Sequence, residues 1–183
     1  MKPKILIWDN DGTVTGSKNP NDPSKVILSG VEKAMREAEF NFMISGFKSP
    51  ESEAQDFDPE KVASNLKDLM TKLPIKVAAF SPLIGGISCY VLILKPGEGF
   101  FLKKAHEDPR YHDYIGHFKK PDIGMFVVIR DIALEEFGLI LDEKNSLMIG
   151  DSWQDEAAAK SFGIPFKEAR LIHQKLSKVK LTY

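Results

Sequence analysis

The stretch that decides the fold is ILIWDNDGT, residues 5–13. It opens with the apolar run ILIW and stops abruptly at the polar, glycine-containing turn DNDGT. A short, uninterrupted apolar run is typical of a strand in a parallel sheet, because such a strand is covered on both faces. The stretch therefore predicts a buried parallel strand whose carboxyl end carries Asp9.

Similar apolar runs recur along the chain and alternate with segments of helical periodicity. The expected strands are residues 5–8, 40–44, 75–80, 147–150 and 164–166, and the expected helices are residues 31–38, 59–73, 121–137, 153–162 and a basic tail from residue 167. Strands that alternate with helices predict a parallel sheet with right-handed crossovers. We therefore expect an α/β fold, a Rossmann-like three-layer sandwich around a mainly parallel five-stranded sheet.

One segment breaks this alternation. Residues 87–94 and 100–102 are strand-like and are joined by the turn KPGEG, which predicts a small β-hairpin, and residues 106–117 follow as a polar, aromatic-rich loop. A chain of 183 residues fits one compact domain. We expect a single domain over residues 1–183, with residues 81–118 as a small insertion near the carboxyl ends of the strands.

The composition is that of an ordinary globular protein. Hydrophobic residues make up 43% and charged residues 28% of the chain, and the formal net charge of −1 provides no global basic field for nucleic acid. The single cysteine, Cys89, excludes an internal disulfide, and no cysteine–histidine cluster has zinc spacing. No apolar run approaches the roughly 18 residues of a membrane span. We expect a cytoplasmic protein with no membrane partner.

Three of the expected strand ends carry polar side chains. In a parallel sheet, ligands bind beyond the carboxyl ends of the strands, so Asp9, Ser45 and Asp151 are expected at one edge. Asp9 and Asp11 alternate in an extended segment and can face the same small site. Two adjacent carboxylates repel each other unless a cation lies near them, and Mg²⁺ is the hard ion that prefers oxygen ligands.

Four short motifs resemble, in order, the signatures of the haloacid dehalogenase-like (HAD) superfamily. They are DxDGT at residues 9–13, ISG at 44–46, KKP at 119–121 and IGDSxxD at 149–155. The resemblance implies a HAD-type fold and a phosphatase that passes the phosphoryl group through Asp9 as an aspartyl phosphate. An acid at position 11 is similar to the pattern of the phosphatases, and the short interval between the first two motifs leaves no room for the large cap of the phosphomutases.

The resemblance also implies a role for each motif residue. Asp9 would be the nucleophile and Asp11 the general acid and base. Ser45 and Lys120 would bind the phosphoryl group, with Lys119 competing for the role of Lys120. The implied metal ligands for Mg²⁺ are Asp9, the backbone carbonyl of Asp11, Asp151, and Asp155 acting through water. The expected substrate contacts are Thr13, the backbone near Gly46, Arg110 and His112, the last two because loops on a rigid edge often carry selectivity.

The segment KPDIGM, residues 120–125, resembles a branch that contains histidinol-phosphate phosphatase, heptose-bisphosphate phosphatase and the polynucleotide 3′-phosphatase. We expect a small phosphorylated metabolite, a sugar or polyol phosphate, as the substrate. Two alternatives remain open: a nucleic-acid 3′-end phosphatase, indicated by the basic residues after residue 169, and a non-catalytic phosphate-binding regulator. The sequence does not indicate the oligomeric state.

Overall fold

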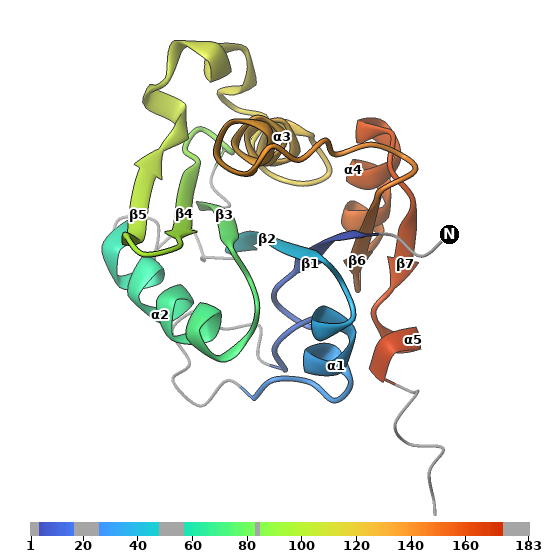
Figure 1. Ribbon diagram of the computed structural model, residues 1–183. Coiled ribbons are helices and arrows are strands. Elements are labelled where there is room, and N and C mark those ends of the chain that lie inside the picture. The colour runs from blue at the N-terminus through green and yellow to red at the C-terminus, as the bar shows by residue number, and fades with distance from the viewer. Residues whose placement is uncertain (1–3, 17–25, 48–56, 83–84, 174–183) are drawn as a thin grey trace, which may run out of the picture.

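The computed structural model describes residues 4–16, 26–47, 57–82 and 85–173 of the chain. In these residues seven strands form one sheet in the order β5-β4-β3-β2-β1-β6-β7 (Figure 1). The strands are β1 (Ile5–Asp9), β2 (Phe40–Phe47), β3 (Val77–Pro82), β4 (Tyr90–Lys95), β5 (Gly99–Lys104), β6 (Ser146–Gly150) and β7 (Phe166–Glu168).

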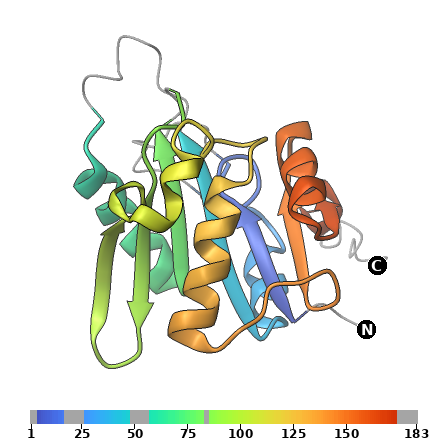
Figure 2. The ribbon, with the colours of Figure 1, turned by 90° about the horizontal axis from the view of Figure 1, so that it is seen from above.

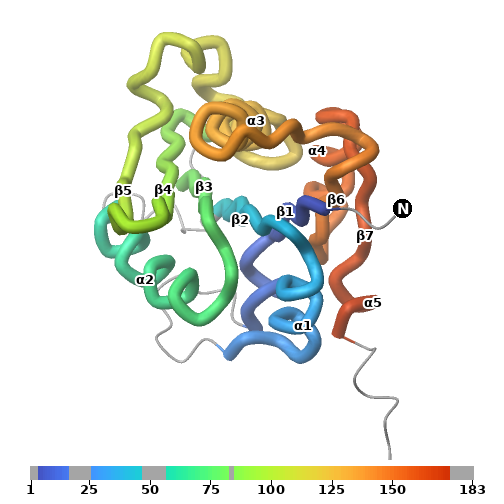
Figure 3. The backbone as a smooth tube through the Cα atoms, viewed as in Figure 1, coloured from blue at the N-terminus to red at the C-terminus, as the bar shows by residue number. Residues whose placement is uncertain are grey.

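The strand β1 lies between β2 and β6 and is parallel to both. The parallel arrangement continues outward, with β3 beside β2 and β7 beside β6. Asp9 is in register with Ile44 on β2, and Trp8 is in register with Ile149 on β6. Segments that are far apart in the sequence thus end side by side at one edge of the sheet, as Figure 3 shows for β1 and β6.

Helices cover both faces of this sheet (Figure 1). On one face lie α3 (Gly124–Phe137) and α4 (Trp153–Phe162), and on the other lie α1 (Val31–Arg36), α2 (Pro59–Lys72) and α5 (Arg170–His173). Successive side chains of β1 enter the two cores in turn: Ile7 packs with α3 and α4, whereas Trp8 packs with α1 and α2. The predicted three-layer α/β arrangement is confirmed, and it explains why β1 is apolar throughout.

The predicted five-stranded sheet with a separate hairpin is not confirmed, because the hairpin is part of the sheet. Its first strand, β4, pairs antiparallel with β3, and β5 pairs antiparallel with β4, so the five parallel strands become seven. The side chains of β4 are buried on both faces, Val91 and Ile93 toward α3 and Leu92 toward α2. A strand covered on both faces gains more as a sheet member than as a detached ribbon.

The segment predicted as a loop at residues 106–117 contains two short 3₁₀ helices, η2 (Ala105–Glu107) and η3 (Pro109–Tyr114). They follow β5 and lie next to α3, where Tyr111 is buried in the same core as the α3 side chains (Figure 2). In the part of the chain that the structure describes, no helix is long and apolar enough to span a membrane. Most of the predicted basic tail, from residue 174 onward, lies outside the described residues.

A buried asparagine joins β2 to its surroundings. The Asn41 side chain accepts a hydrogen bond from Trp8 Nε1 at 3.0 Å and donates to the carbonyl oxygens of Met35 at 2.9 Å and Pro74 at 3.2 Å. Asn41 is 1% exposed, so water cannot replace these partners. Its amide therefore holds β1, the end of α1 and the segment before β3 in one arrangement.

We predict that Asn41→Ala lowers the free energy of unfolding by about 3 kcal/mol, because it leaves the Trp8 N–H buried without a partner and removes the hydrogen bonds to the Met35 and Pro74 carbonyl groups. Urea unfolding followed by circular dichroism measures the change. The control variant Ser64→Ala, on the exposed face of α2, should shift stability by less than about 0.5 kcal/mol. Equal shifts for the two variants would contradict the role given to Asn41.

Candidate active site

Three aspartates meet where β1 and β6 end. Asp9 is the last residue of β1, Asp151 directly follows β6, and Asp155 lies in the first turn of α4. One oxygen from each of these carboxylates lies within 4.8 Å of the other two. Within the described ranges, this is the group of acidic side chains that could hold a metal ion. Asp9 and Asp151 were expected to lie close together, because each was placed at the carboxyl end of an expected parallel strand.

The turn after β1 is held by its own backbone. The carbonyl oxygen of Asn10 accepts hydrogen bonds from the N–H groups of Thr13, Val14 and Thr15 at 2.9 to 3.2 Å. The Thr15 carbonyl accepts in turn from the Gly12 N–H at 2.8 Å. A turn with this many internal bonds keeps the residues next to Asp9 in one conformation, which a reactive centre requires.

Gly12 lets the turn approach Asp151. Its φ of +88° lies in the left-handed region that favours glycine, and a Cβ atom at this position would lie 2.1 Å from Asp151 Oδ2. A side chain at position 12 would therefore displace the Asp151 carboxylate. The sequence pattern indicates only a tight turn at Gly12; the structure adds that Gly12 makes room for a candidate metal ligand.

Lys120 joins two of the three aspartates. Its ammonium group donates to Asp9 Oδ1 at 2.5 Å and also to Asp155 Oδ1. Burial alone would lower the pKa of Lys120, but the adjacent charges of Asp9 and Asp155 outweigh it and raise the pKa above its usual value. Lys120 is 9% exposed, whereas Lys119 is exposed, so the structure favours Lys120 in the predicted competition.

The position of Lys120 depends on two loops that pack together before α3. The carbonyl oxygen of Gly86 accepts hydrogen bonds from the N–H groups of Gly116 at 3.0 Å and Phe118 at 3.2 Å. Phe118 is fully buried, which anchors the segment that leads to Lys120. The helix predicted from residue 121 begins later, at Gly124, whose N–H donates to the His117 carbonyl at 3.1 Å.

Asp155 serves mainly as a support. Its Oδ2 accepts hydrogen bonds from Ser152 N at 3.1 Å and Ser152 Oγ at 2.7 Å, and its N–H donates to Ser152 Oγ at 3.4 Å, which completes a capping box at the start of α4. Its Oδ1 accepts from Lys120, and the side chain is completely buried. Asp155 thus belongs to the cluster geometrically, but both its oxygens are engaged by the protein. This arrangement suits the predicted indirect role better than direct coordination.

The pKa of Asp9 reflects its burial and, to a smaller extent, the charges around it. Burial raises the pKa of Asp9 to about 7; the Lys120 ammonium opposes this shift, and the negative charges of Asp155 and Asp151 add to it. A divalent cation among the carboxylates would favour the ionised form of Asp9. The all-oxygen donor set is the kind that Mg²⁺ prefers, so the residues present fit the predicted ion.

Two hydroxyl groups on segments that adjoin Asp9 in the chain or in the sheet are buried without a hydrogen-bond partner in the described structure. They are Ser45 Oγ and Thr13 Oγ1, on residues that are 1% and 0% exposed. Ser45 follows Ile44, the β2 residue in register with Asp9, and Gly46 follows Ser45 on the same strand. Ser45 lies near the carboxyl end of β2, which continues to Phe47 and is longer than expected, and Thr13 lies in the turn after β1. Buried hydroxyls normally have partners, so unpaired ones at these places indicate groups that a ligand could engage.

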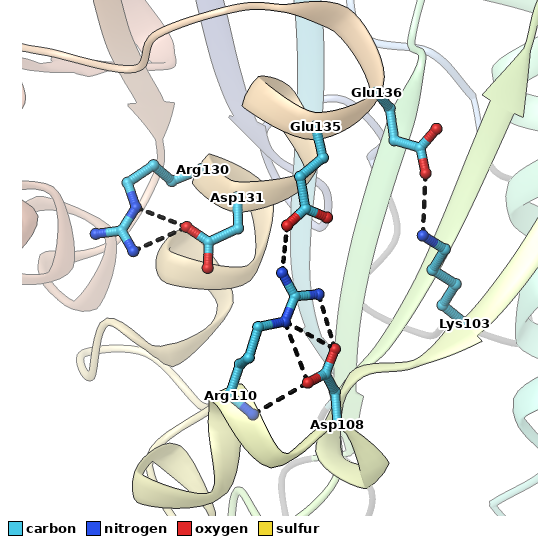
Figure 4. Close-up of polar contacts among 7 residues, drawn as sticks. All are labelled: Lys103, Asp108, Arg110, Arg130, Asp131, Glu135 and Glu136. Atoms are coloured by element: carbon cyan, nitrogen blue, oxygen red, sulfur yellow. Dashed lines mark hydrogen bonds and ion pairs between the residues drawn. The ribbon is translucent and has the colours of Figure 1, made fainter.

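The structure does not bring Arg110 and His112 to the aspartate cluster. Arg110 donates to Asp108 at 2.8 Å and to Glu135, near the end of α3 (Figure 4). From Gly124 to Glu135 the helix rises about 16 Å, so this ion pair lies far along α3 from the Lys120 end. Hydrogen bonds from Arg110 lower the pKa of Asp108, and the charge of the exposed His112 adds to this effect. The predicted substrate contacts at these two residues therefore gain no support, because η3 folds against α3.

Asp11 and His173 both contact the turn that follows Asp9. The backbone of Asp11 pairs with that of Thr15 in an isolated β-bridge. Asp11 is half-buried, and its side chain is not one of the three clustered carboxylates. His173 Nε2, at the end of α5, lies 2.9 Å from the carbonyl oxygen of Thr13, which accepts its hydrogen bond. His173 was not predicted from the sequence, since no local pattern signals a contact across 160 positions.

The capping residue Ser152 was also missed, although the spacing S-x-x-D signals it.

Comparisons with known proteins give weak similarities. No protein-family model and no curated protein matches the chain. A solved structure of D,D-heptose 1,7-bisphosphate phosphatase from B. bronchiseptica, complexed with magnesium and phosphate, is 20% identical with a TM-score of 0.49 and covers 89% of this chain and 78% of that chain. A haloacid dehalogenase-like hydrolase from Brucella suis 1330 is 11% identical with a TM-score of 0.43, over 91% of this chain and 88% of that one. Similarities with such low identities and TM-scores carry no argument about function, so the function of this protein is argued from its own residues.

We predict that Mg²⁺ raises the melting temperature by about 5 °C when the free ion is about 100 times its dissociation constant. Asp151→Asn should abolish the shift, because it removes a charged ligand from the exposed side of the cluster. Differential scanning calorimetry with Mg²⁺ or with a chelator measures the effect. Asp113→Asn, at an exposed acid in η3, serves as the control and should keep the full shift.

We predict that Gly12→Ala weakens Mg²⁺ binding by about 10-fold or more, because the new methyl group would displace Asp151. Isothermal titration calorimetry measures the affinity. Gly97→Ala is a matched control, since Gly97 also has a positive φ of +80° but a Cβ atom added there would meet nothing within 4 Å. If both variants kept the affinity of the unaltered protein, the close approach of Gly12 to Asp151 would be without consequence for the metal.

Proposed function

We propose that this protein is a Mg²⁺-dependent phosphohydrolase that transfers the phosphoryl group of a phosphomonoester first to Asp9 and then to water. The observation that carries the proposal is the buried contact of the Lys120 ammonium group with Asp9, inside a cluster of carboxylates that suits a divalent cation. Phosphoryl transfer depends mainly on positioning and on electrostatic stabilisation, and this cluster provides both.

The residues proposed to hold Mg²⁺ are Asp9, Asp151 and the backbone carbonyl of Asp11. Asp155 is proposed to support the ion through water. When bound, the ion would neutralise charge on the phosphoryl oxygens. Lys120 supplies a second positive charge and remains protonated, as the raised pKa of its ammonium group indicates. Its hydrogen bond to Asp9 Oδ1 orients the carboxylate, and we assign the attack to the other oxygen, Oδ2.

In the first step, the Asp9 carboxylate forms a bond to phosphorus while the bond from phosphorus to the alcohol oxygen breaks. Asp11 donates a proton to the departing oxygen, which leaves as the alcohol. Asp9 then carries the phosphoryl group as a mixed anhydride, a recognised covalent strategy for aspartate. The bonded turn at Asn10 keeps Asp9 and Asp11 in fixed relation during this exchange.

In the second step, Asp11 takes a proton from water as the oxygen of that water attacks phosphorus. The bond between phosphorus and the Asp9 oxygen breaks, which releases inorganic phosphate and restores the carboxylate. Ser45 Oγ and a backbone N–H near Gly46 are proposed to donate hydrogen bonds to the phosphoryl oxygens, and Thr13 is proposed to assist them. The unpaired state of the Ser45 hydroxyl in the described structure supports its role.

We further propose a small phosphorylated metabolite, a sugar or polyol phosphate, as the substrate. The resemblance of residues 120–125 to the sugar-phosphate branch supports this class. We also propose that residues 81–118 form an insertion within a single HAD-like domain, because their two ends meet at Gly86 and Gly116, next to the segment that carries Lys120. The residues proposed for nucleic-acid binding lie mostly outside the described ranges, and no described observation favours that alternative.

Asp9→Asn is expected to lower turnover of an aryl phosphate by at least about 10³-fold, because the amide cannot serve as the nucleophile. Release of inorganic phosphate in the presence of Mg²⁺ measures the rate. Borohydride reduction during turnover should trap the acyl phosphate, so that peptide mass spectrometry finds the modification at Asp9 and not at Asp11.

The matched variant for this experiment is Asp113→Asn, which removes an exposed acid from η3. It should retain the full rate, and far-ultraviolet circular dichroism should show that both variants are folded. Turnover that persists in Asp9→Asn at the rate of the unaltered protein would refute the proposal, as would a trapped acyl group on a different residue.

A further inference from the structure

A groove of about 440 Å³ opens beside the aspartate cluster. Its walls include Ser152, Trp153 and Glu156 at the start of α4, Phe166 and Glu168 from β7, and Arg170 at the start of α5. The catalytic steps proposed above make no use of this groove. It is therefore available for another part of the substrate.

The groove is continuous with the site through Asp151, which lines the groove and also belongs to the carboxylate cluster. Glu168 is in register with Gly150, the residue before Asp151, and Ala169 N donates to Gly150 O at 2.8 Å. The end of β7 is thus fixed alongside Asp151. A phosphomonoester with its phosphorus at Asp9 can extend its alcohol part past Asp151 into this groove.

Trp153 is the most unusual wall of the groove. It is 67% exposed, whereas the other tryptophan of the chain, Trp8, is completely buried. Trp153 is the first residue of α4, whose start is held by the capping box of Ser152 and Asp155. An indole on a rigid helix end offers a flat surface at little entropic cost, and its face attracts cations.

The charges of the groove favour the same kind of ligand. Glu156 and Glu168 line it, and the single basic residue among its described lining residues, Arg170, forms an ion pair with Glu168. Because Arg170 is paired with Glu168, no other basic side chain among the described lining residues neutralises the charge of Glu156. Such a lining disfavours a second phosphate and suits a positively charged group, which the indole face of Trp153 would also bind.

We propose that this groove is the subsite for the leaving group and that the alcohol part of the substrate carries a protonated amine, held against the face of Trp153 and near Glu156. The inference rests on the proposed phosphohydrolase function and narrows its substrate class to phosphate esters of amino alcohols or amino sugars. Trp153 is then a specificity residue that acts on the leaving group and not on the phosphoryl transfer.

A series of ω-aminoalkyl phosphates of increasing chain length tests the proposal, each compared with the ω-hydroxyalkyl phosphate of equal length. At the chain length that reaches Trp153, the amine should be preferred in kcat/KM by about fivefold, the range of one exposed cation–π contact. The preference should appear mainly in KM, because the groove binds the leaving group. Equal values at every chain length, or a preference for the hydroxyl series, would overturn the proposal.

Two variants assign the preference to the groove. Trp153→Leu and Glu156→Gln should each reduce the preference for the amine by raising KM for the amino series. Glu98→Gln is the matched control, because Glu98 is also exposed but lies in the turn between β4 and β5, at the opposite edge of the sheet. The control should keep the full preference, and loss of the preference in the control alone would count against the groove.

Tryptophan fluorescence tests the groove without catalysis. In Asp9→Asn protein with Mg²⁺, the preferred ω-aminoalkyl phosphate should change the emission of Trp153 with a saturable dependence, and the hydroxyl analogue should need a higher concentration. With Trp153→Leu added, Trp8 remains as a buried emitter and the change should disappear. No emission change with any amine would overturn the groove proposal even if the phosphatase activity is found. An emission change without turnover of any phosphate by the unaltered protein would support the groove and refute the proposed hydrolysis.

Discussion

The buried ammonium group of Lys120 between Asp9 and Asp155 is the interaction on which the rest of the site depends. Removing an ion from water costs several kcal/mol, and this cost is offset only when partners surround the ion closely. Lys120 meets that condition through two carboxylates that come from different elements, the end of β1 and the first turn of α4. The same contact therefore stabilises the charge and fixes the relative positions of the strand, the helix and the segment before α3.

Much of this arrangement could be predicted from the sequence, because it follows from the topology of a parallel sheet. A short apolar run that ends in an acid predicted both β1 and the position of Asp9, and the same pattern predicted β6 and Asp151. Once the strands are parallel and adjacent, their carboxyl ends must meet, and no side-chain detail is needed. Lys120 was predicted only through its motif, since a lysine in a turn has no pattern that indicates burial.

The rest could not be predicted because it depends on packing between distant segments. The residues of β4 have the pattern of a strand, but whether a hairpin stands apart or extends a sheet is decided by the helix faces that cover it, here α2 and α3. Arg110 was expected at the edge of the site, yet Glu135 lies within its reach once η3 packs on α3. The double engagement of Asp155 by Lys120 and Ser152 likewise becomes visible only when the three residues are assembled.

The balance of charge in the cluster has a consequence for ligand binding. Three carboxylates surround one ammonium group, so negative charge is in excess. The pKa of Asp9 is raised to about 7 mainly by burial, and the charges of Asp155 and Asp151 add to the shift. A phosphate ester brings further negative charge, so the metal-free cluster would repel it. Three carboxylates and one ammonium group leave a net charge of −2, which a divalent cation cancels, so that phosphate can then bind beside the cation. Metal and substrate should therefore each increase the affinity for the other, which by linkage must hold equally in both directions.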